Sequence, residues 1–504
     1  SNWKYNRMSA YDFPSDLTMM WDMSAGGKVY PLSSGRGKKR MQSNLARLNY
    51  SYKSKYMATV SYRADGSSVF VEGNKYAHFL SGALAWRLSA EPWIEKLNIF
   101  DDLKLRLSYG QTGNQGIDTY ATLPAMSVAG YVFNGSLSSG YAEQTWKGPI
   151  NKNLKWETTD QVDLGLDMSF AKGRVNLTID AYYKRTNDLL QKVNIETNSG
   201  YTQMATNIGH VINKGLEITG VFHPTVHKDL NWEIDANISF NRNRIGGLTG
   251  DQYASQFVNS IKNVFVMRNG CPIGTVVGFV EDGFYDNLAE VRADPRYANV
   301  SEGEAKSMIG EIKYRDYNKD GQITDADKRV IGDTNPDFIY GLTNTLQYKN
   351  FTFSFFLQGT YGNDIVNANT IANNTSASMT GISNITREQY DTRWREGHTE
   401  GAKWPKAVAD GYTREWKFTD RYIEDGSYLR LKNVSLGYTF FPKNWKGINS
   451  INVYASASNL FTITKYSWYD PDVNAFGSDV SRQGVDLFSY PSSRTFSFGV
   501  KMSF

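Results

Sequence analysis

The sequence predicts an all-β fold, a transmembrane antiparallel β-barrel with long extracellular loops, of which this chain supplies about 13 strands. Three observations lead to this prediction: long segments of alternating apolar and polar residues, connections that alternate between short and long, and abundant aromatic residues. The 504 residues include 32 Tyr, 26 Phe and 12 Trp. Such rings form the belts that barrels place at both membrane interfaces.

The alternation is clearest in the last strand. Phe496, Phe498, Val500 and Met502 fall on one side of an extended chain, and the polar residues between them fall on the other, because successive side chains of a strand point to opposite faces. The same pattern recurs over 162–170, 175–183 and 232–240. Segments of about ten or more residues suit a tilted crossing of a bilayer, whereas soluble strands usually have ~5–6 residues. We therefore expect the apolar side chains of the last strand, Phe496, Phe498, Val500 and Met502, to face lipid.

The opposite face of these segments carries ionised groups in mid-strand. They are Asp163, Asp167, Asp180, Glu217, Glu233 and Asp235. A water-filled lumen accommodates such groups, as the interior of an outer-membrane barrel does.

The connections support the same fold. Short ones are expected at 53–55, 171–174, 223–229, 349–350 and 442–449, and a longer one with a helical turn at 90–102. Long polar loops are expected at 64–79, 111–157, 187–209, 243–336, 361–427 and 461–491. Short turns on the periplasmic side and long loops outside are typical of outer-membrane barrels.

The expected strands lie near 44–52, 56–63, 80–89, 103–110, 158–170, 175–186, 210–222, 231–242, 337–348, 351–360, 428–440, 450–460 and 492–504. The alternation changes phase near Lys432 and Asn433, which predicts a β-bulge. Bacterial barrels close with an even number of strands, and an open edge in lipid leaves backbone groups unpaired. We therefore expect strand 44–52 to have an open edge completed by an N-terminal half of the same barrel. Residues 1–43 are expected to form an extracellular loop segment leading into barrel residues 44–504.

Composition excludes several other classes. The sequence contains no run of about 18 apolar residues, so no membrane-spanning helix is predicted. The net charge of +4 is small for this length, so nucleic acid is not an expected partner. The single cysteine, Cys271, is expected to be an inert thiol. No Ser/His/Asp grouping stands out, and we do not expect an enzyme.

Several motifs, in order along nearly the whole chain, resemble the C-terminal half of the SusC-like TonB-dependent transporters of the Bacteroidetes outer membrane. They are 63–68 (RADGSS), 103–115 (LKLRLSYGQTGNQ), 153–157 (NLKWE), 213–218 (NKGLEI), 428–434 (YLRLKNV), 459–462 (NLFT) and the ending from Tyr490 to Phe504. The resemblance implies a plugged barrel of about 22 strands. It also implies a TonB-contacting segment, an N-terminal plug absent from this chain, and a SusD-like lipoprotein lid.

The expected function is TonB-dependent import of an oligomeric nutrient, a glycan or an oligopeptide, across the bacterial outer membrane. A passive porin or a surface adhesin is the alternative. An upstream plug would separate these classes.

One local motif has the spacing of a calcium loop. Its expected oxygen ligands are Asp316, Asn318, Asp320, the carbonyl of Gln322, and Asp327 at the twelfth position. Calcium takes six to eight such oxygens, and a glycine at the sixth position permits the sharp turn. Asp327 replaces the usual Glu and has a shorter reach. A turn rich in Asp, Asn and Gly that holds no ion is the alternative.

Aromatic residues of the long loops are candidates for stacking on sugar rings or peptide side chains. They are Trp146, Trp394, Trp404, Trp416, Trp468 and Tyr469. Aromatic girdles and loop packing are the alternative roles. The resemblance further implies that the terminal Phe504 is read by the barrel-insertion machinery.

Overall fold

A computed structural model describes residues 2–13, 23, 26–29, 33–124, 126–143, 148–254, 261–371, 385–407, 416–443, 445 and 447–504. Among these residues, no helix is long and apolar enough to cross a membrane.

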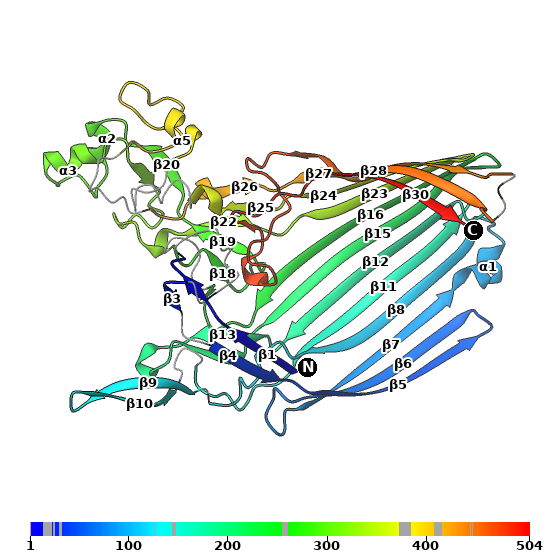
Figure 1. Ribbon diagram of the computed structural model, residues 1–504, viewed down its shortest axis with the longest axis horizontal. Coiled ribbons are helices and arrows are strands. Elements are labelled where there is room, and N and C mark those ends of the chain that lie inside the picture. Colours follow the sequence, from blue (N-terminus) through cyan, green and yellow to red (C-terminus); the bar gives the residue numbers. More distant parts are fainter. Residues whose placement is uncertain are drawn as a thin grey trace.

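A single antiparallel sheet of 13 strands dominates the described part of the chain (Figure 1). In spatial order its strands are β30 (Thr495–Ser503), β28 (Ser450–Thr464), β27 (Tyr428–Phe440), β24 (Phe351–Tyr361), β23 (Phe338–Tyr348), β16 (Leu230–Gly246), β15 (His210–His227), β12 (Val175–Asn187), β11 (Glu157–Phe170), β8 (Phe100–Asn114), β7 (Tyr76–Arg87), β6 (Tyr56–Ser67) and β5 (Met41–Tyr52). The predicted number of strands and the all-β fold are confirmed.

The sheet is curved but not closed. Within the described residues β5 pairs only with β6, and β30 pairs only with β28. The predicted open edge is therefore present. β5 begins at Met41, three residues before the expected start, because its pairing with β6 continues to Met41 opposite Ser67.

Local chemistry explains the short connections. Lys53 and Ser54, between β5 and β6, both have a φ of 52°, the left-handed backbone required by the tight turns that join twisted strands. The turn after β11 likewise places Ala171 and Lys172 at positive φ. The connection between β7 and β8 contains the expected helical turn, η3 (Leu88–Ala90) followed by α1 (Pro92–Glu95). These turns gather at one end of the sheet, and the long connections gather at the other (Figure 1).

Two irregularities interrupt the ladders. Pairing of β27 shifts register on both sides of Lys432, between Phe356 and Leu357 of β24 and between Leu431 and Asn433. This confirms the predicted bulge. The second irregularity lies next to the turn between β15 and β16, where β15 runs on to His227 and β16 already begins at Leu230. The register of this pair shifts between Phe222 and Thr225. Pro224 lies in that shift and has no backbone N–H to donate to the ladder.

The two faces of the sheet differ in chemistry. One face carries a row of apolar residues in direct register from β7 to β16: Leu84, Leu107, Leu164, Ala181, Leu216 and Phe240. Their large side chains stay exposed, so the protein itself does not cover this band. An apolar band of this kind is what a barrel presents to lipid. On β30, Phe496, Phe498, Val500 and Met502 share one face as predicted and are also exposed.

The opposite face bears an ion-pair network in mid-sheet. Arg106 of β8 donates from Nε to Asp167 at 2.9 Å and from Nη2 to Asp180 at 2.8 Å. Lys104 Nζ lies 2.8 Å from the same Asp167 carboxylate. Charged groups paired in this way need water or one another, so this face is the lumenal one.

The long connections fold into smaller elements at the loop end of the sheet. The strands are β1 (Asn2–Arg7), β2 (Ala10–Tyr11), β3 (Lys28–Val29), β4 (Ser33–Lys38), β9 (Met126–Phe133), β10 (Ser136–Glu143), β13 (Leu190–Asn194), β14 (Gln203–Asn207), β17 (Gln252–Tyr253), β18 (Phe265–Met267), β19 (Thr275–Gly278), β20 (Glu281–Phe284), β21 (Ile312–Tyr314), β22 (Arg329–Asp333), β25 (Asp364–Asn367), β26 (Ile423–Asp425) and β29 (Val485–Asp486). The helices are α2 (Leu288–Ala293), α3 (Glu302–Ser307), α5 (Arg387–Thr392), η5 (Thr197–Ser199), η6 (Asp325–Asp327), η7 (Asp420–Tyr422) and η8 (Val480–Arg482).

These loops have hydrophobic cores of their own. The largest joins three connections that are far apart in sequence, through Phe265, Val276, Val366, Tyr422 and Val485 among others. Burial of such side chains typically contributes ~1.5–3 kcal/mol each. The loop end of the sheet is therefore a packed surface on which side chains hold defined positions.

Candidate functional site

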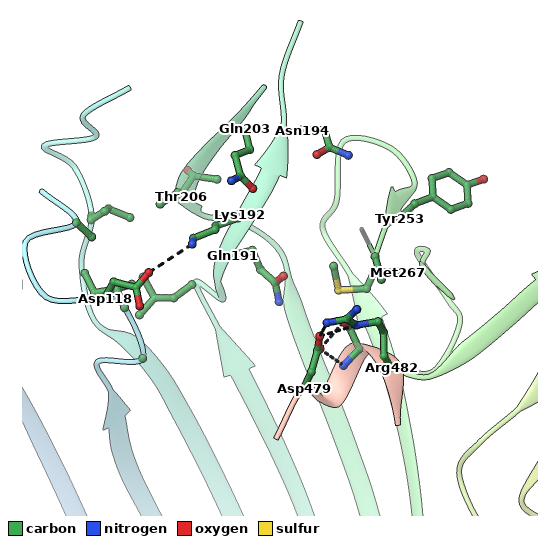
Figure 2. A pocket seen from close by; sticks show the side chains of 18 residues that line it. Asp118, Gln191, Lys192, Asn194, Gln203, Thr206, Tyr253, Met267, Asp479 and Arg482 are labelled. Carbon is green, nitrogen blue, oxygen red and sulfur yellow. Dashed lines mark hydrogen bonds and ion pairs between the residues drawn. The ribbon is translucent and has the colours of Figure 1, made fainter. Parts of the chain in front are cut away.

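A cleft of about 440 Å³ opens among the packed loops (Figure 2). One wall is the β13–β14 hairpin, and another is the segment after β8, at 116–121. The β17 and β18 strands supply Tyr253 and Met267, and η8 supplies Arg482. Four connections thus meet at one cavity, as the loops of a binding site on a rigid scaffold commonly do.

The hairpin places polar side chains along the cleft. Gln191 of β13 lies opposite Thr206 of β14, and Asn194 lies opposite Gln203. The apolar part of the lining includes Leu154, Leu190 and Ala205, and all three also belong to the loop core around Trp156. The hairpin is therefore fixed from behind while its amides line the cavity.

The charged residues of the cleft are neutralised in pairs. Lys192 Nζ lies 3.4 Å from Asp118 Oδ2, and Arg482 Nη2 lies 2.7 Å from Asp479 Oδ2 (Figure 2). Burial raises the pKa of Asp479, but hydrogen bonds from Ser481 and Arg482 lower it more, so the pKa ends below its usual range. Asp479 is thus ionised at neutral pH, and each of the two pairs joins one acidic and one basic side chain.

The tyrosine of the cleft stays protonated. Burial and the nearby Asp251 carboxylate raise the pKa of Tyr253 above its usual range. Its phenol can therefore donate a hydrogen bond at any physiological pH. With the amides it gives the cleft donors and acceptors for a polar, uncharged ligand group. These residues do not form a nucleophile–base arrangement of the kind that covalent catalysis requires.

The loop predicted to bind calcium follows β21 and ends with η6, and its side-chain oxygens accept hydrogen bonds from the loop's own backbone. Asp316 accepts from the N–H groups of Lys319 at 2.6 Å and Gly321 at 2.8 Å. Asn318 Nδ2 donates to Asp320 at 2.8 Å. Gly321, at the sixth position, has a φ of 77° as the motif requires. The donors are all oxygens, which suits calcium.

Asp327, at the twelfth position, is fully buried. It accepts from the N–H groups of Tyr317 at 3.0 Å and Thr324 at 2.9 Å, and with Thr324 it forms a capping box at η6. The described residues hold no group of three His, Cys, Asp or Glu side chains arranged around a common metal position. Calcium binding by this loop remains a prediction.

The aromatic candidates fall into two sets. Trp394 and Trp404 are buried and leave little ring surface for a substrate: Trp394 Nε1 donates to Asp286 at 2.8 Å, and Arg421 lies over the Trp404 ring. Trp416 packs against the same loop core as Trp404. All three side chains pack within the loop end, and stacking of a substrate on the aromatic candidates remains a prediction. Trp468 is half-buried and meets Tyr469, which is 74% exposed, edge to face at 5.3 Å.

Two predicted site residues remain, Trp146 and Phe504. Trp146 lies outside the described residues. Phe504 follows the end of β30 and is exposed; its role in assembly remains a prediction.

Sequence reasoning missed the cleft residues Gln191, Asn194, Gln203, Asp479 and Arg482. The hairpin and η8 are almost 300 residues apart, and no local pattern predicts their contact.

Several known proteins are similar to this chain. A family model described as "TonB dependent receptor-like, beta-barrel" matches residues 2–460. TonB-dependent receptor P3 of Formosa agariphila is 34% identical over 98% of this chain and 48% of its own length. TonB-dependent receptor SusC of Bacteroides thetaiotaomicron is 33% identical over 92% of this chain and 43% of its own length. This chain thus spans about half the length of the curated relatives it matches.

Among solved structures, that of the RagAB peptide transporter superposes with a TM-score of 0.78, at 22% identity, over 100% of this chain and 52% of the matched chain. A membrane-length antiparallel sheet, apolar on one face and charged on the other, with packed loops at one end, is the wall of an outer-membrane β-barrel. The chain belongs to the TonB-dependent receptor β-barrel family, and the resemblance to SusC-like transporters is confirmed. It is an outer-membrane protein.

Proposed function

We propose that this chain forms the C-terminal part of a TonB-dependent transporter that imports an oligomeric nutrient, a glycan or an oligopeptide. The observation that carries the proposal is the combination of a charged lumenal face with a cleft of polar side chains at the loop end of the same sheet. A cleft at that end lies where a solute arriving from outside first meets the barrel. One solved structure that superposes on this chain is that of a peptide transporter, which supports the peptide alternative.

The test is uptake by cells that carry the full-length protein. Deletion of its gene should abolish growth on one purified polysaccharide or on a peptide mixture as sole carbon source, and complementation should restore growth. Removal of TonB or addition of a protonophore should abolish uptake too. Uptake that continues without TonB would indicate a passive porin, and adhesion without uptake would indicate an adhesin.

We further propose that a SusD-like lipoprotein covers the loop end. The β9–β10 hairpin supports this partner because it extends beyond the strand ends (Figure 1). Near its tip Val132 pairs with Leu137, while Tyr131 and Phe133 lie on the other face, and all four are exposed. An isolated two-stranded hairpin is marginally stable in water, and exposed apolar patches commonly mark protein interfaces.

Co-purification from outer membranes tests the partner. Phe133→Ser should reduce the amount of lipoprotein recovered with the full-length transporter. Tyr490→Ser, at another exposed ring of the loop end, is the matched control and should not. Equal recovery from both variants would remove the hairpin from the interface.

A further inference from the structure

The N-terminal ribbon formed by β1 and β4 carries two neighbouring aromatic rings, Trp3 and Tyr5, which form an aromatic platform. Trp3 lies opposite Gly37, and Tyr5 lies opposite Gly35. Each ring covers its glycine so closely that an added Cβ would clash; at Gly35 it would lie 2.5 Å from Cε1 of Tyr5. The two ring planes are within 13° of each other, with centroids 5.8 Å apart. Trp3 is 46% exposed and Tyr5 51%, so their outer faces are open to solvent.

The same ribbon is strongly basic. Residues 2–7 and 33–38 contain Lys4, Arg7, Arg36 and Lys38 but no Asp or Glu. All four cations are exposed, and the described residues provide none of them with an ion pair. Lys4 lies directly opposite Arg36, and like charges in that position destabilise a strand pair.

One of the four cations lies on the same face of the ribbon as the two rings. Side chains two residues apart on a strand share a face, so Arg7 continues the row that Trp3 and Tyr5 begin. Lys4, Arg36 and Lys38 occupy the other face. A ligand lying along the rings would therefore meet the Arg7 guanidinium at the end of the platform, while the three other cations lie on the opposite face of the ribbon.

The ribbon borders the cleft of the loop end. At the end of β4, the backbone N–H of Lys38 donates to Tyr120 Oη at 3.1 Å, and Nζ of the following Lys39 donates to the carbonyl of Gln115 at 3.4 Å. Residues Gly116 and Asp118 of that same segment line the cleft. Figure 1 shows β1 and β4 at the loop end of the sheet.

We propose that the β1–β4 ribbon binds an anionic oligosaccharide, with consecutive pyranose rings stacked on Trp3 and Tyr5 and a carboxylate or sulfate group held by Arg7. The C–H face of a pyranose is apolar and packs on an aromatic ring, and an acidic substituent projects from the ring edge, where Arg7 continues the row of the two rings. A lipid acyl chain would require an apolar groove, whereas this surface is open and flanked by charge. The inference rests on the proposed import function, because it names the substrate class selected at the mouth of the barrel.

Calorimetric titration of the purified full-length transporter with oligogalacturonate tests the proposal, and the fully methyl-esterified oligosaccharide serves as the matched neutral ligand. We expect the acidic form to bind at least about tenfold more tightly, with affinity that falls as salt is raised. Trp3→Ala/Tyr5→Ala should weaken binding of both forms by about tenfold or more. Arg7→Gln should remove most of the preference for the acidic form while the neutral form binds as before.

Two further variants separate the platform from the fold of the ribbon. Gly35→Ala keeps both rings but forces the Tyr5 ring away from the strand, so it should weaken binding of both oligosaccharides. Tyr131→Ala removes an exposed ring outside the ribbon and should leave binding unchanged. Sulfated and desulfated galactan oligosaccharides extend the same comparison to sulfate groups.

Several results would overturn the inference. These are equal affinity for the acidic and neutral forms, absence of binding to any of the four oligosaccharides, or equal binding by the wild type and the Trp3/Tyr5 variant. Displacement of oligogalacturonate by lipopolysaccharide at much lower concentrations would instead assign the ribbon to the membrane surface. Because binding to purified protein does not require TonB, failure of energised uptake in cells would not affect this outcome.

Discussion

The buried pair between Arg430 and Asp470 should dominate the stability of the loop end beside the last strand. Arg430 of β27 is 2% exposed and donates from Nη2 to Asp470 and from Nε to Thr462 at 3.0 Å. The second oxygen of Asp470 accepts from the backbone N–H of Ser492 at 3.0 Å, just before β30. Asp470→Ala would leave a buried guanidinium without its main partner. Breaking a buried pair in this way costs about 3–5 kcal/mol.

The control is Asp472→Ala. Asp472 lies 3.7 Å from Arg430 Nη1, but its side chain is 49% exposed, so its loss should cost less than about 1 kcal/mol. Thermal unfolding of the purified protein at one fixed scan rate, followed by tryptophan fluorescence, compares the two variants. Limited proteolysis of 465–492 locates the effect. Equal midpoints and equal cleavage for both variants would refute the assignment of the pair as the main clamp.

The pH dependence provides an independent check. Burial raises the pKa of Asp470, but the N–H groups of Asp472 and Ser492 and the Arg430 guanidinium lower it more, so the folded pKa lies below its usual range. The contribution of the pair is then fully present above the unfolded pKa of ~3.9 and is lost as the pH falls through the lower folded value. The difference in stability between wild type and Asp470→Ala should therefore be constant from pH 7 to 5. A difference that shrinks over that interval contradicts the argument.

Three further predictions concern the membrane wall, its assembly and the candidate calcium loop. Leu164→Lys, in the middle of the lipid-facing row, should cost about 2–4 kcal/mol and lower the folded fraction in the outer membrane. Ser108→Lys, opposite Asp163 on the lumenal face, should not. Deletion of Phe504 should reduce the amount inserted without changing uptake per inserted molecule; unchanged membrane levels would argue against a role in assembly. Asp320→Ala should loosen loop 316–327 and weaken docking of the lid while barrel assembly stays intact, and calcium should protect this loop from proteolysis in the wild type only. Equal protection in the variant would favour the turn without an ion.

The sequence was sufficient to predict the barrel wall. A strand that crosses lipid must keep period-two alternation over its whole length, so segments such as 162–170 and 496–502 indicate their own structure and faces. The bulge at Lys432 was predictable for the same reason, because an inserted residue shifts the phase of the pattern. The tight turns at 53–55 and 171–174 were predictable because the alternation stops at these positions and resumes directly after them.

The loop end was decided only by tertiary structure. Its residues obey no period, because loops are held by packing between segments distant in sequence and not by a repeating ladder. Trp394 and Trp404 therefore resemble ligand-stacking rings in the sequence, although the structure encloses both in loop cores. Conversely, Trp3 and Tyr5 form a platform only because β4 places Gly37 and Gly35 beneath them. The alternation of side chains is a property of each strand alone, whereas a cleft or a platform is a property of the segments that the fold brings together.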